Sequence, residues 1–287
     1  MKKIMLALSA ALLLTACSAD EEVATINAEI TINREEMAEI TFNFSEITQQ
    51  AMTRASLAEL GLTDIWIFDY VDGSLVQTIH QTSTDAAFGS PTLSLEYGEH
   101  TFYFVASRGV DPSVDTSAEK IVWASVRDTF HSSLTMNVQP TSASSHNVTL
   151  SRVVGRLRIV ATDVVPATAA KLTVTPSVWY YGLSYKTGEP TAAGTSPLSV
   201  NIPSSYIGTT SLQASFYTVS GSTPWQTAVS VSLLASDESV IGAVNIPDIP
   251  MQRNHITTYS GGIVGTGRSM TIVASDDEWV EDTTVDW

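Results

Sequence analysis

The residue with the clearest chemistry in this chain is Cys17, its only cysteine. It ends the segment Leu14-Thr15-Ala16-Cys17, which resembles a lipobox, where a signal is cut before the cysteine and a lipid is attached to its sulfur. Lys2 and Lys3 precede an apolar run over residues 4–16, which is typical of a secretory signal and too short to span a membrane as a helix. We therefore predict lipidation of Cys17; the alternative is an ordinary signal with a chance cysteine. A single cysteine also excludes an intramolecular disulfide.

The residues after Cys17 indicate where in the cell the protein is located. Asp20-Glu21-Glu22 is an acidic cluster that is similar to the surface-export tag of lipoproteins from Bacteroidetes. A solvated acidic linker explains the same charges. We predict a lipid-anchored protein of the outer membrane, exposed at the cell surface, and leave the linker as the alternative.

The charge of the chain excludes two kinds of partner. Removal of residues 1–16 takes away two lysines and changes the formal charge from −16 to −18. Such an acidic chain does not suit nucleic acid, whose phosphates are bound by clustered lysine and arginine. It does not suit electrostatic docking on an anionic membrane either. Abundant Thr, Ser and Val in short apolar runs indicate a β-rich secreted protein.

No segment carries a recognisable active site. There is no Gly-x-Ser-x-Gly motif, and the five histidines lie in separate segments without metal-ligand spacing. Residues 69–73 and 276–278 could hold a cation, but a turn between strands and a solvated acidic tail explain them. The glycine-rich residues 261–267 are not followed by a predicted helix that could bind a phosphate. We therefore predict no enzyme, no metal and no cofactor.

Hydrophobic alternation predicts strands along almost the whole chain. Residues 23–32 and 40–44 alternate with period two, and residues 62–70 form a nearly continuous apolar run, as an inner strand would. Asp72-Gly73 predicts a hairpin into residues 74–80. Further strands are expected over residues 93–95, 101–107, 148–161, 172–179, 198–202, 212–219, 228–234, 240–246, 256–264, 270–274 and 283–287.

Two segments do not follow the strand pattern. Trp123, Val126 and Phe130 are spaced three and four residues apart, which predicts a short amphipathic helix within residues 117–130. Residues 48–56 have neither period, and we expect them to form an exposed loop.

The best linker candidate is the polar, small and aperiodic stretch over residues 140–145. We place the domain boundary there. The predicted parts are a signal peptide over 1–16, a lipidated segment with the first strands over 17–56, and two β-sandwich domains over 57–145 and 146–287.

The order of these pieces resembles the fimbrillin family, the lipoprotein-derived pilins of type V pili with their anchor and tip subunits. The resemblance covers nearly the whole chain after Cys17. The segments that carry it are the lipobox, residues 39–44, the loop with Thr53-Arg54-Ala55, residues 62–69, 72–76, 149–157 and 253–261, Trp279 and Trp287.

The resemblance implies an all-β fold of two transthyretin-like β-sandwich domains, with at most one or two short helices and no catalysis. It also implies assembly with other fimbrial subunits, as a homo- or hetero-polymer, by donor-strand exchange. A trypsin-like protease would cut after an arginine behind the first strand, and the groove left by that strand would accept a C-terminal strand from a neighbour. Arg54 is at the matching position, and Arg34 is a second candidate with a poorer match.

The strand-like runs at the C-terminus are too short to stand alone, so we expect them to pair either with their own domain or with a neighbouring subunit. Acidic residues between the two runs would discourage indiscriminate edge pairing. The predicted assembly strand carries Met270, Ile272, Trp279, Val285 and Trp287.

We therefore predict a structural subunit of a cell-surface fimbria that serves adhesion. The alternative is a surface glycan-binding lipoprotein of a nutrient-uptake system, because residues 179–181 and Trp225 could stack on sugars. Trp66 and Trp123 lie in apolar runs and are expected in the core. A surface hydrolase is a third hypothesis, which no motif supports. An anchor subunit would keep its lipid and its N-terminal segment, and the position in the fibre stays open.

Overall fold

The structure of the protein is a computed structural model. It describes residues 37–48, 54–55, 57, 60–265, 270–275 and 285–286. Residues from Glu35 onward form one compact unit, and Met1–Arg34 is a separate unit that lies outside the described residues. Cys17, Arg34, Trp279 and Trp287 lie outside them too, as do the predicted strand over 23–32 and the acidic residues 276–278.

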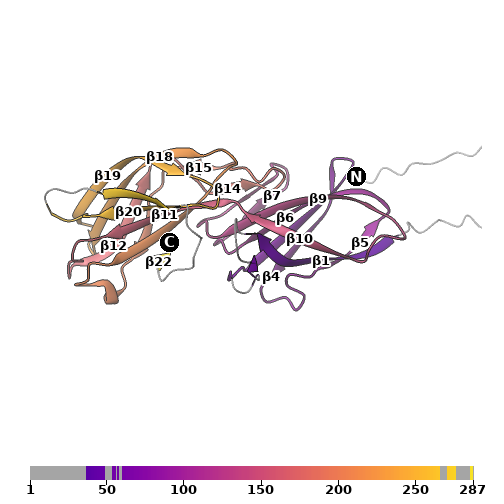
Figure 1. The fold of residues 1–287 in the computed structure, drawn as a ribbon, viewed down its shortest axis with the longest axis horizontal. Coiled ribbons are helices and arrows are strands. Elements are labelled where there is room, and N and C mark those ends of the chain that lie inside the picture. The colour runs from indigo at the N-terminus through magenta and orange to yellow at the C-terminus, as the bar shows by residue number, and fades with distance from the viewer. Residues whose placement is uncertain are drawn as a thin grey trace, which may run out of the picture. The chain divides into compact units, whose positions relative to one another are not determined.

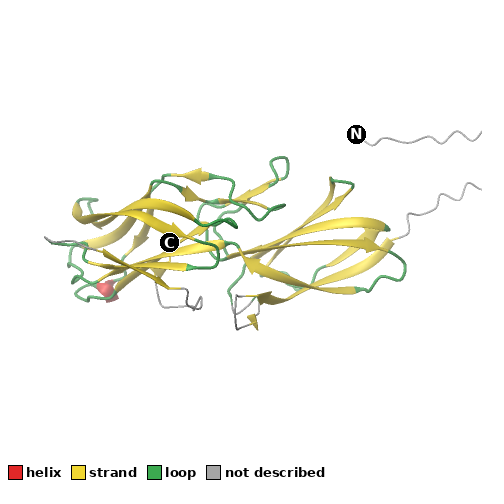
Figure 2. Ribbon diagram, turned by 45° about the horizontal axis from the view of Figure 1, so that its top comes forward, coloured by secondary structure: helices red, strands yellow, loops and turns green. Residues whose placement is uncertain are grey.

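Strands make up most of the described chain, and Figure 2 shows them in yellow. The one helical element among the described residues is a single 3-10 turn, η1 (Ser204–Tyr206). The all-β fold predicted from the sequence is confirmed.

The first eight-stranded sheet, indigo to magenta in Figure 1, has the order β2-β1-β10-β9-β6-β3-β4, with β5 paired to β1. Its strands are β1 (Met37–Thr48), β2 (Arg54–Ala55), β3 (Asp64–Val71), β4 (Ser74–Thr82), β5 (Thr92–Glu96), β6 (Gly98–Ser107), β9 (Thr129–Val138) and β10 (Ser145–Arg152). β3 is buried on both faces, as its apolar run predicts: Ile65 and Ile67 enter one core, and Trp66 and Phe68 enter another.

The hairpin predicted at Asp72-Gly73 joins β3 to β4. Both residues have positive φ, 49° for Asp72 and 73° for Gly73. Two successive positive φ angles are the mark of a type I′ turn, which matches the twist of the strands that it joins.

The second half has two sheets around one core. The five-stranded sheet has the order β21-β20-β11-β17-β22, and the four-stranded sheet has the order β16-β12-β18-β19. Their strands are β11 (Val154–Ala161), β12 (Ala169–Pro176), β16 (Leu198–Asn201), β17 (Leu212–Val219), β18 (Trp225–Ala235), β19 (Val240–Met251), β20 (Ile256–Gly261), β21 (Met270–Ser275) and β22 (Val285–Asp286). Leu157 and Phe216 from the first sheet share this core with Leu172 and Val231 from the second, which makes a β-sandwich.

A three-stranded sheet connects the two halves. It consists of β7 (Ser113–Asp115), β8 (Lys120–Val122) and β14 (Gly182–Ser184), in the order β14-β8-β7. A small hairpin of β13 (Trp179–Tyr180) and β15 (Ala193–Gly194) lies next to β14 in the chain. A third apolar cluster contains residues of both halves, among them Phe68 and Tyr217.

The short helix predicted within residues 117–130 is wrong. The segment forms β8 and an irregular stretch before β9. Trp123, Val126 and Phe130 are buried, at 2%, 1% and 0% exposure. Trp123 and Val126 pack with Leu183 of β14, and Phe130 of β9 packs in the core of the first sheet. Partners distant in sequence bury them, and not the face of a helix.

The stretch predicted as a linker joins β9 to β10, two neighbouring strands of the first sheet. β10 therefore belongs to the first sheet, and the chain passes to the second half at Val153, between β10 and β11. The predicted domain limits themselves stay a prediction.

Candidate strand-exchange site

β1 has strand partners on both sides. Residues 41–48 run parallel to β10, while residues 37–41 pair antiparallel with β5. The amides of Phe42 and Phe44 donate hydrogen bonds to the carbonyls of Pro91 and Gly89, at 3.0 and 2.9 Å. Among the described strands, β5 pairs with β1 and with no other. β1 is thus the strand that connects β5 to the rest of the sheet.

The side chains of β1 alternate between core and surface. Ile40, Phe42 and Phe44 are 1%, 0% and 1% exposed. The ring of Phe42 lies 4.8 Å from that of Phe102 and 5.3 Å from that of Phe104, measured between centroids. Burial of each such side chain is worth roughly 1.5–3 kcal/mol. Loss of β1 would therefore uncover an apolar groove between β10 and β5.

Arg54 lies in β2, not in a loop. Its backbone pairs antiparallel with Thr48 at the end of β1, so the loop predicted over residues 48–56 is wrong at Arg54 and Ala55. The pairing is short, because β2 has two residues. Cleavage after Arg54 by a protease stays a prediction, because the structure does not test it.

The chain that follows β2 is anchored in the same core as β1. Leu57, Leu60 and Leu62 are 8%, 4% and 3% exposed and belong to the cluster around Phe42. The amide of Leu62 donates to the carbonyl of Leu57 at 3.1 Å. A cut after Arg54 would therefore separate β1 from a segment that stays fixed in the core.

Both C-terminal strands pair with their own sheet in this structure. β21 pairs antiparallel with β20 over six residues, from Gly261↔Met270 to Ile256↔Ser275, and it includes Ile272. β22 pairs parallel with β17 through two residues, with Val285 opposite Ala214. Of the predicted assembly residues, Met270, Ile272 and Val285 thus have partners within the chain, and a role in assembly stays a prediction.

The aromatic residues that suggested a glycan platform are partly structural. Trp66 and Trp123, each 2% exposed, are core residues as predicted. Trp179 is 3% exposed and donates its indole N–H to the Tyr217 carbonyl at 2.8 Å. Trp225 packs edge-on against Tyr180 at 5.0 Å between centroids. The side chains of Trp179 and Trp225 are therefore engaged in contacts within the fold.

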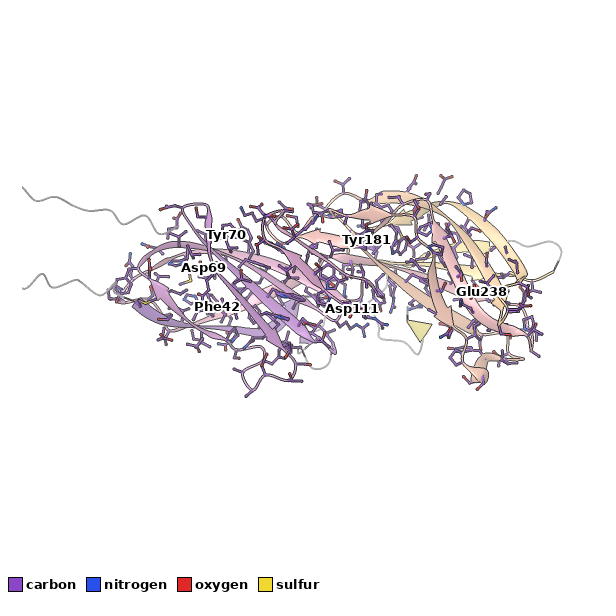
Figure 3. All side chains as sticks on the ribbon, turned by 180° about the vertical axis from the view of Figure 1, so that it is seen from behind. Phe42, Asp69, Tyr70, Asp111, Tyr181 and Glu238 are labelled. Carbon is purple, nitrogen blue, oxygen red and sulfur yellow. The ribbon has the colours of Figure 1, made fainter. Side chains whose placement is uncertain are left out.

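A pocket of about 290 Å³ lies beside this aromatic group. Tyr181, which is 36% exposed and labelled in Figure 3, is the candidate platform residue that it leaves most open to solvent. The pocket is lined by Trp123, Ala124, Val126, Trp179, Tyr181, Gly194, Ser196, Pro197 and Leu198. The other aromatic side chains in the lining, Trp123 and Trp179, are only 2% and 3% exposed.

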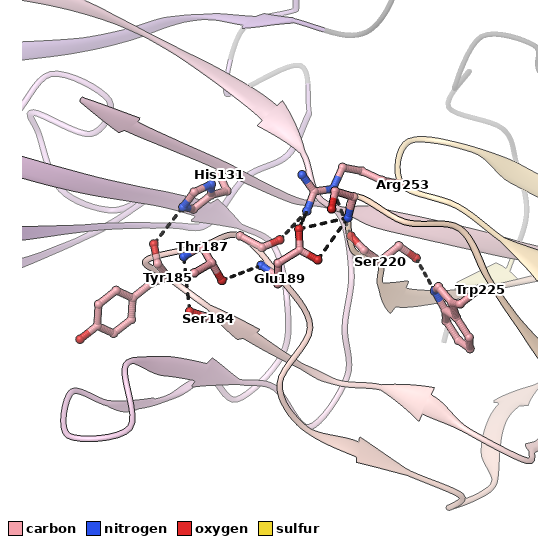
Figure 4. Close-up of polar contacts among 10 residues, drawn as sticks. His131, Ser184, Tyr185, Thr187, Glu189, Ser220, Trp225 and Arg253 are labelled. Atoms are coloured by element: carbon pink, nitrogen blue, oxygen red, sulfur yellow. Dashed lines mark hydrogen bonds and ion pairs between the residues drawn. The ribbon is translucent and has the colours of Figure 1, made fainter. Parts of the chain in front are cut away.

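A polar network fixes the turn after β14, as Figure 4 shows. Arg253 donates from Nε to the Ser220 carbonyl at 3.1 Å and from Nη2 to the Gly188 carbonyl, and it lies 3.5 Å from the Glu189 carboxylate. His131 donates from Nε2 to the Tyr185 carbonyl at 2.8 Å, and burial lowers its pKa, which keeps the ring neutral. These contacts are structural.

A second pocket, of about 300 Å³, lies next to Arg253 and is lined by Ser151, Arg152, Ser222, Gln252, Arg253, Asn254 and His255. Within the part of the chain that the structure describes, no three His, Cys, Asp or Glu side chains gather as a metal site needs. None of the described residues forms a helix with the length and apolar character needed to cross a membrane.

Solved structures with this fold include two candidate binding proteins of Bacteroides. A candidate adhesin from Bacteroides ovatus is 12% identical with a TM-score of 0.53, over 85% of this chain and 95% of that one. A candidate polysaccharide-binding protein from Bacteroides thetaiotaomicron is 10% identical with a TM-score of 0.52, over 84% of this chain and 99% of that one.

The fimbrial anchor protein Mfa2 from Porphyromonas gingivalis fits more loosely, with 10% identity and a TM-score of 0.48 over 83% of this chain and 95% of that one. At these identities the likeness concerns the fold alone.

The chain is thus an all-β protein with β-sandwich packing. It belongs to the family of unknown function DUF6562, whose model matches residues 113–286. No curated protein matches it in sequence.

Proposed function

We propose that the protein is a structural subunit of a cell-surface fimbria that serves adhesion, and that it assembles by strand exchange. The observation that supports this most is the position of β1. It is an apolar inner strand from the N-terminal end of the chain, next to β10 on one side and β5 on the other. A groove left by such a strand has unpaired backbone on both sides and accepts an extended strand of suitable pattern.

In this proposal the ends of the chain have separate tasks. A lipid on Cys17 holds the subunit at the outer membrane, and a trypsin-like protease releases β1 by cutting after Arg54. A neighbouring subunit then supplies a C-terminal strand. β22 is better suited than β21 to leave its own sheet, because it is held by two residue pairs and β21 by six. An anchor subunit would omit the cut and keep its lipid.

Limited trypsin digestion is expected to cut first after Arg54. β2 is a two-residue strand, so little pairing has to open before a protease can bind the backbone. Arg152 and Arg156 are 2% and 1% exposed and should resist. Mass spectrometry of the first fragments checks this, with Arg54→Ala as the variant that should lose them. Early cutting after Arg108 or Arg156, with Arg54 intact, would contradict the prediction.

Deletion of residues 276–287 is expected to leave a folded subunit that does not polymerise. The deletion removes β22 and its two pairs with β17, and it keeps β21. Thermal unfolding should therefore stay close to that of the full chain, while chains of subunits should be absent after digestion.

Assembly itself is the test of the proposed function. The trypsin-cut full chain should form ladders on native gels, whereas Arg54→Ala and the truncated chain should stay monomeric. If the truncated chain unfolds or aggregates as a monomer, the tail belongs to its own core and the donor role is wrong.

A further inference from the structure

The first core contains a buried pair of titratable residues on β3 and β6. Asp69 on β3 and His100 on β6 are 1% and 3% exposed. Nδ1 of His100 lies 2.8 and 3.0 Å from the two carboxylate oxygens of Asp69. Figure 3 labels Asp69 near Phe42, and the His100 ring stacks on Phe102, which is also a contact of Phe42. The pair therefore lies within the core that β1 covers.

His100 has a hydrogen-bond partner at each ring nitrogen. Nε2 lies 2.9 Å from the carbonyl oxygen of Glu96, which can only accept a hydrogen bond, so Nε2 carries a hydrogen. Nδ1 bonds to the Asp69 carboxyl group, so the ring bridges Asp69 and Glu96. Burial raises the pKa of Asp69, and the hydrogen bond from His100 acts against this rise.

These two bonds tie a corner of the fold together. Glu96 is the last residue of β5, and His100 is on β6 just after Gly98, whose φ of 143° makes the bend. Asp69 comes from β3, which pairs with β6. Glu96 is also the partner of Met37 at the start of β1. The pair thus fixes the end of β5 to β3 and β6, independently of β1.

We propose that His100 and Asp69 are positioning residues for strand exchange, which keep β5 in place when β1 leaves. β5 has β1 as its strand partner among the described strands, and the hydrogen bond from His100 to the Glu96 carbonyl attaches its end to the core in the absence of β1. A fixed β5 offers the incoming strand a ready edge. The inference rests on the proposed function and adds the residues that preserve the groove.

Few other titratable groups surround the pair. On the turn itself Glu96 and Glu99 have exposed side chains, and Tyr97 is half-buried. On β9 the residue opposite His100 is Met136, which carries no charge. Asp69 is therefore the acidic side chain that pairs with His100.

The test uses the full chain and the double variant Asp69→Leu/His100→Leu. Replacing a buried ion pair by apolar residues is often neutral for overall stability, so the variant should fold. Amide hydrogen exchange of Leu93 and Leu95 should become faster by about tenfold, because two hydrogen bonds to a charged group are lost. After trypsin cutting, affinity for a labelled peptide with the sequence of residues 37–48 should fall by a similar factor.

A matched control pair lies on the surface. His80 Nε2 is 2.7 Å from Asp64 Oδ1, with the two side chains 41% and 15% exposed. His80→Gln should change neither exchange in β5 nor peptide affinity. Unchanged exchange and affinity in the leucine double variant would overturn the inference.

Asp69→Asn provides a second readout. An asparagine can donate to Nδ1, so a neutral His100 would keep both bonds, and peptide affinity should be retained. If Asp69→Asn lost peptide affinity as fully as the leucine double variant, these hydrogen bonds would not be what holds β5, and the inference would be overturned. If the trypsin-cut wild type binds no peptide at all, the proposed strand exchange is wrong. Amide hydrogen exchange in the intact chain then still tests whether Asp69 and His100 hold β5.

Discussion

Replacement of Phe42 by alanine is expected to lower the free energy of unfolding by about 3–5 kcal/mol. The ring is fully buried and packs against Phe102 and Phe104, so its removal leaves a cavity in the first core. Small proteins are stable by only about 5–15 kcal/mol in total, so this loss is a large fraction. Urea unfolding followed by tryptophan fluorescence measures it.

The control for Phe42→Ala is Val76→Ala on β4. Val76 is 56% exposed, and substitutions at such positions usually change stability by less than about 0.5 kcal/mol. An equal, small effect of both substitutions would mean that β1 does not close the first core. The strand could then leave without uncovering a groove, and the proposed assembly would lose its main support.

Replacement of Asp128 by alanine is expected to be similarly severe, at about 3–5 kcal/mol. Arg152 and Asp128 form a two-pronged ion pair, with Nε 2.6 Å from Oδ1 and Nη2 2.8 Å from Oδ2. Both side chains are 0% exposed. The variant leaves a buried guanidinium without its counter-charge, which is far costlier than removing both charges together. Thermal unfolding measures the effect.

Two variants complete this measurement. Lys120→Ala breaks the pair of Lys120 with Asp115, whose Nζ and Oδ2 lie 4.0 Å apart with both side chains well exposed, and should lower stability far less than Asp128→Ala. The double change Arg152→Met/Asp128→Leu should recover most of the stability lost in Asp128→Ala. Equal losses in the single and double variants would show that the cost comes from packing and not from the uncompensated charge.

Local patterns predicted much of the fold. The apolar run over residues 62–70 is an inner strand because both its faces meet apolar clusters. Asp72-Gly73 forms its turn because both residues accept positive φ. Period two identified Phe42 and Phe44 as one face of a strand. In each case the physical cause acts between residues that are close in sequence.

What the sequence could not predict depends on distant partners. Trp123 and Val126 are buried in a cluster with Leu183 of β14, which is distant in sequence, so a helix was expected wrongly. Asp69 was placed in the strand over residues 62–70, but its buried bond to His100 on β6 was not predicted. Arg54 was assigned to a loop, but it is paired with β1. An aspartate beside an apolar run was the one visible sign of the buried pair, and nothing marked His100 as its partner.

The pairing of β1 bears on the direction in which a replacing strand would run. Its neighbours impose opposite requirements, since β10 runs parallel to it and β5 antiparallel. A strand that entered with the direction of β1 would keep the hydrogen-bond pattern on both sides, whereas a reversed strand would pair antiparallel with β10 and parallel with β5. Each subunit would then meet the next through two different surfaces, tail to groove, a heterologous contact that extends without closing. A fibre built this way would be a polar filament. One end would present a groove and the other a donor strand, so subunits would add to the two ends differently.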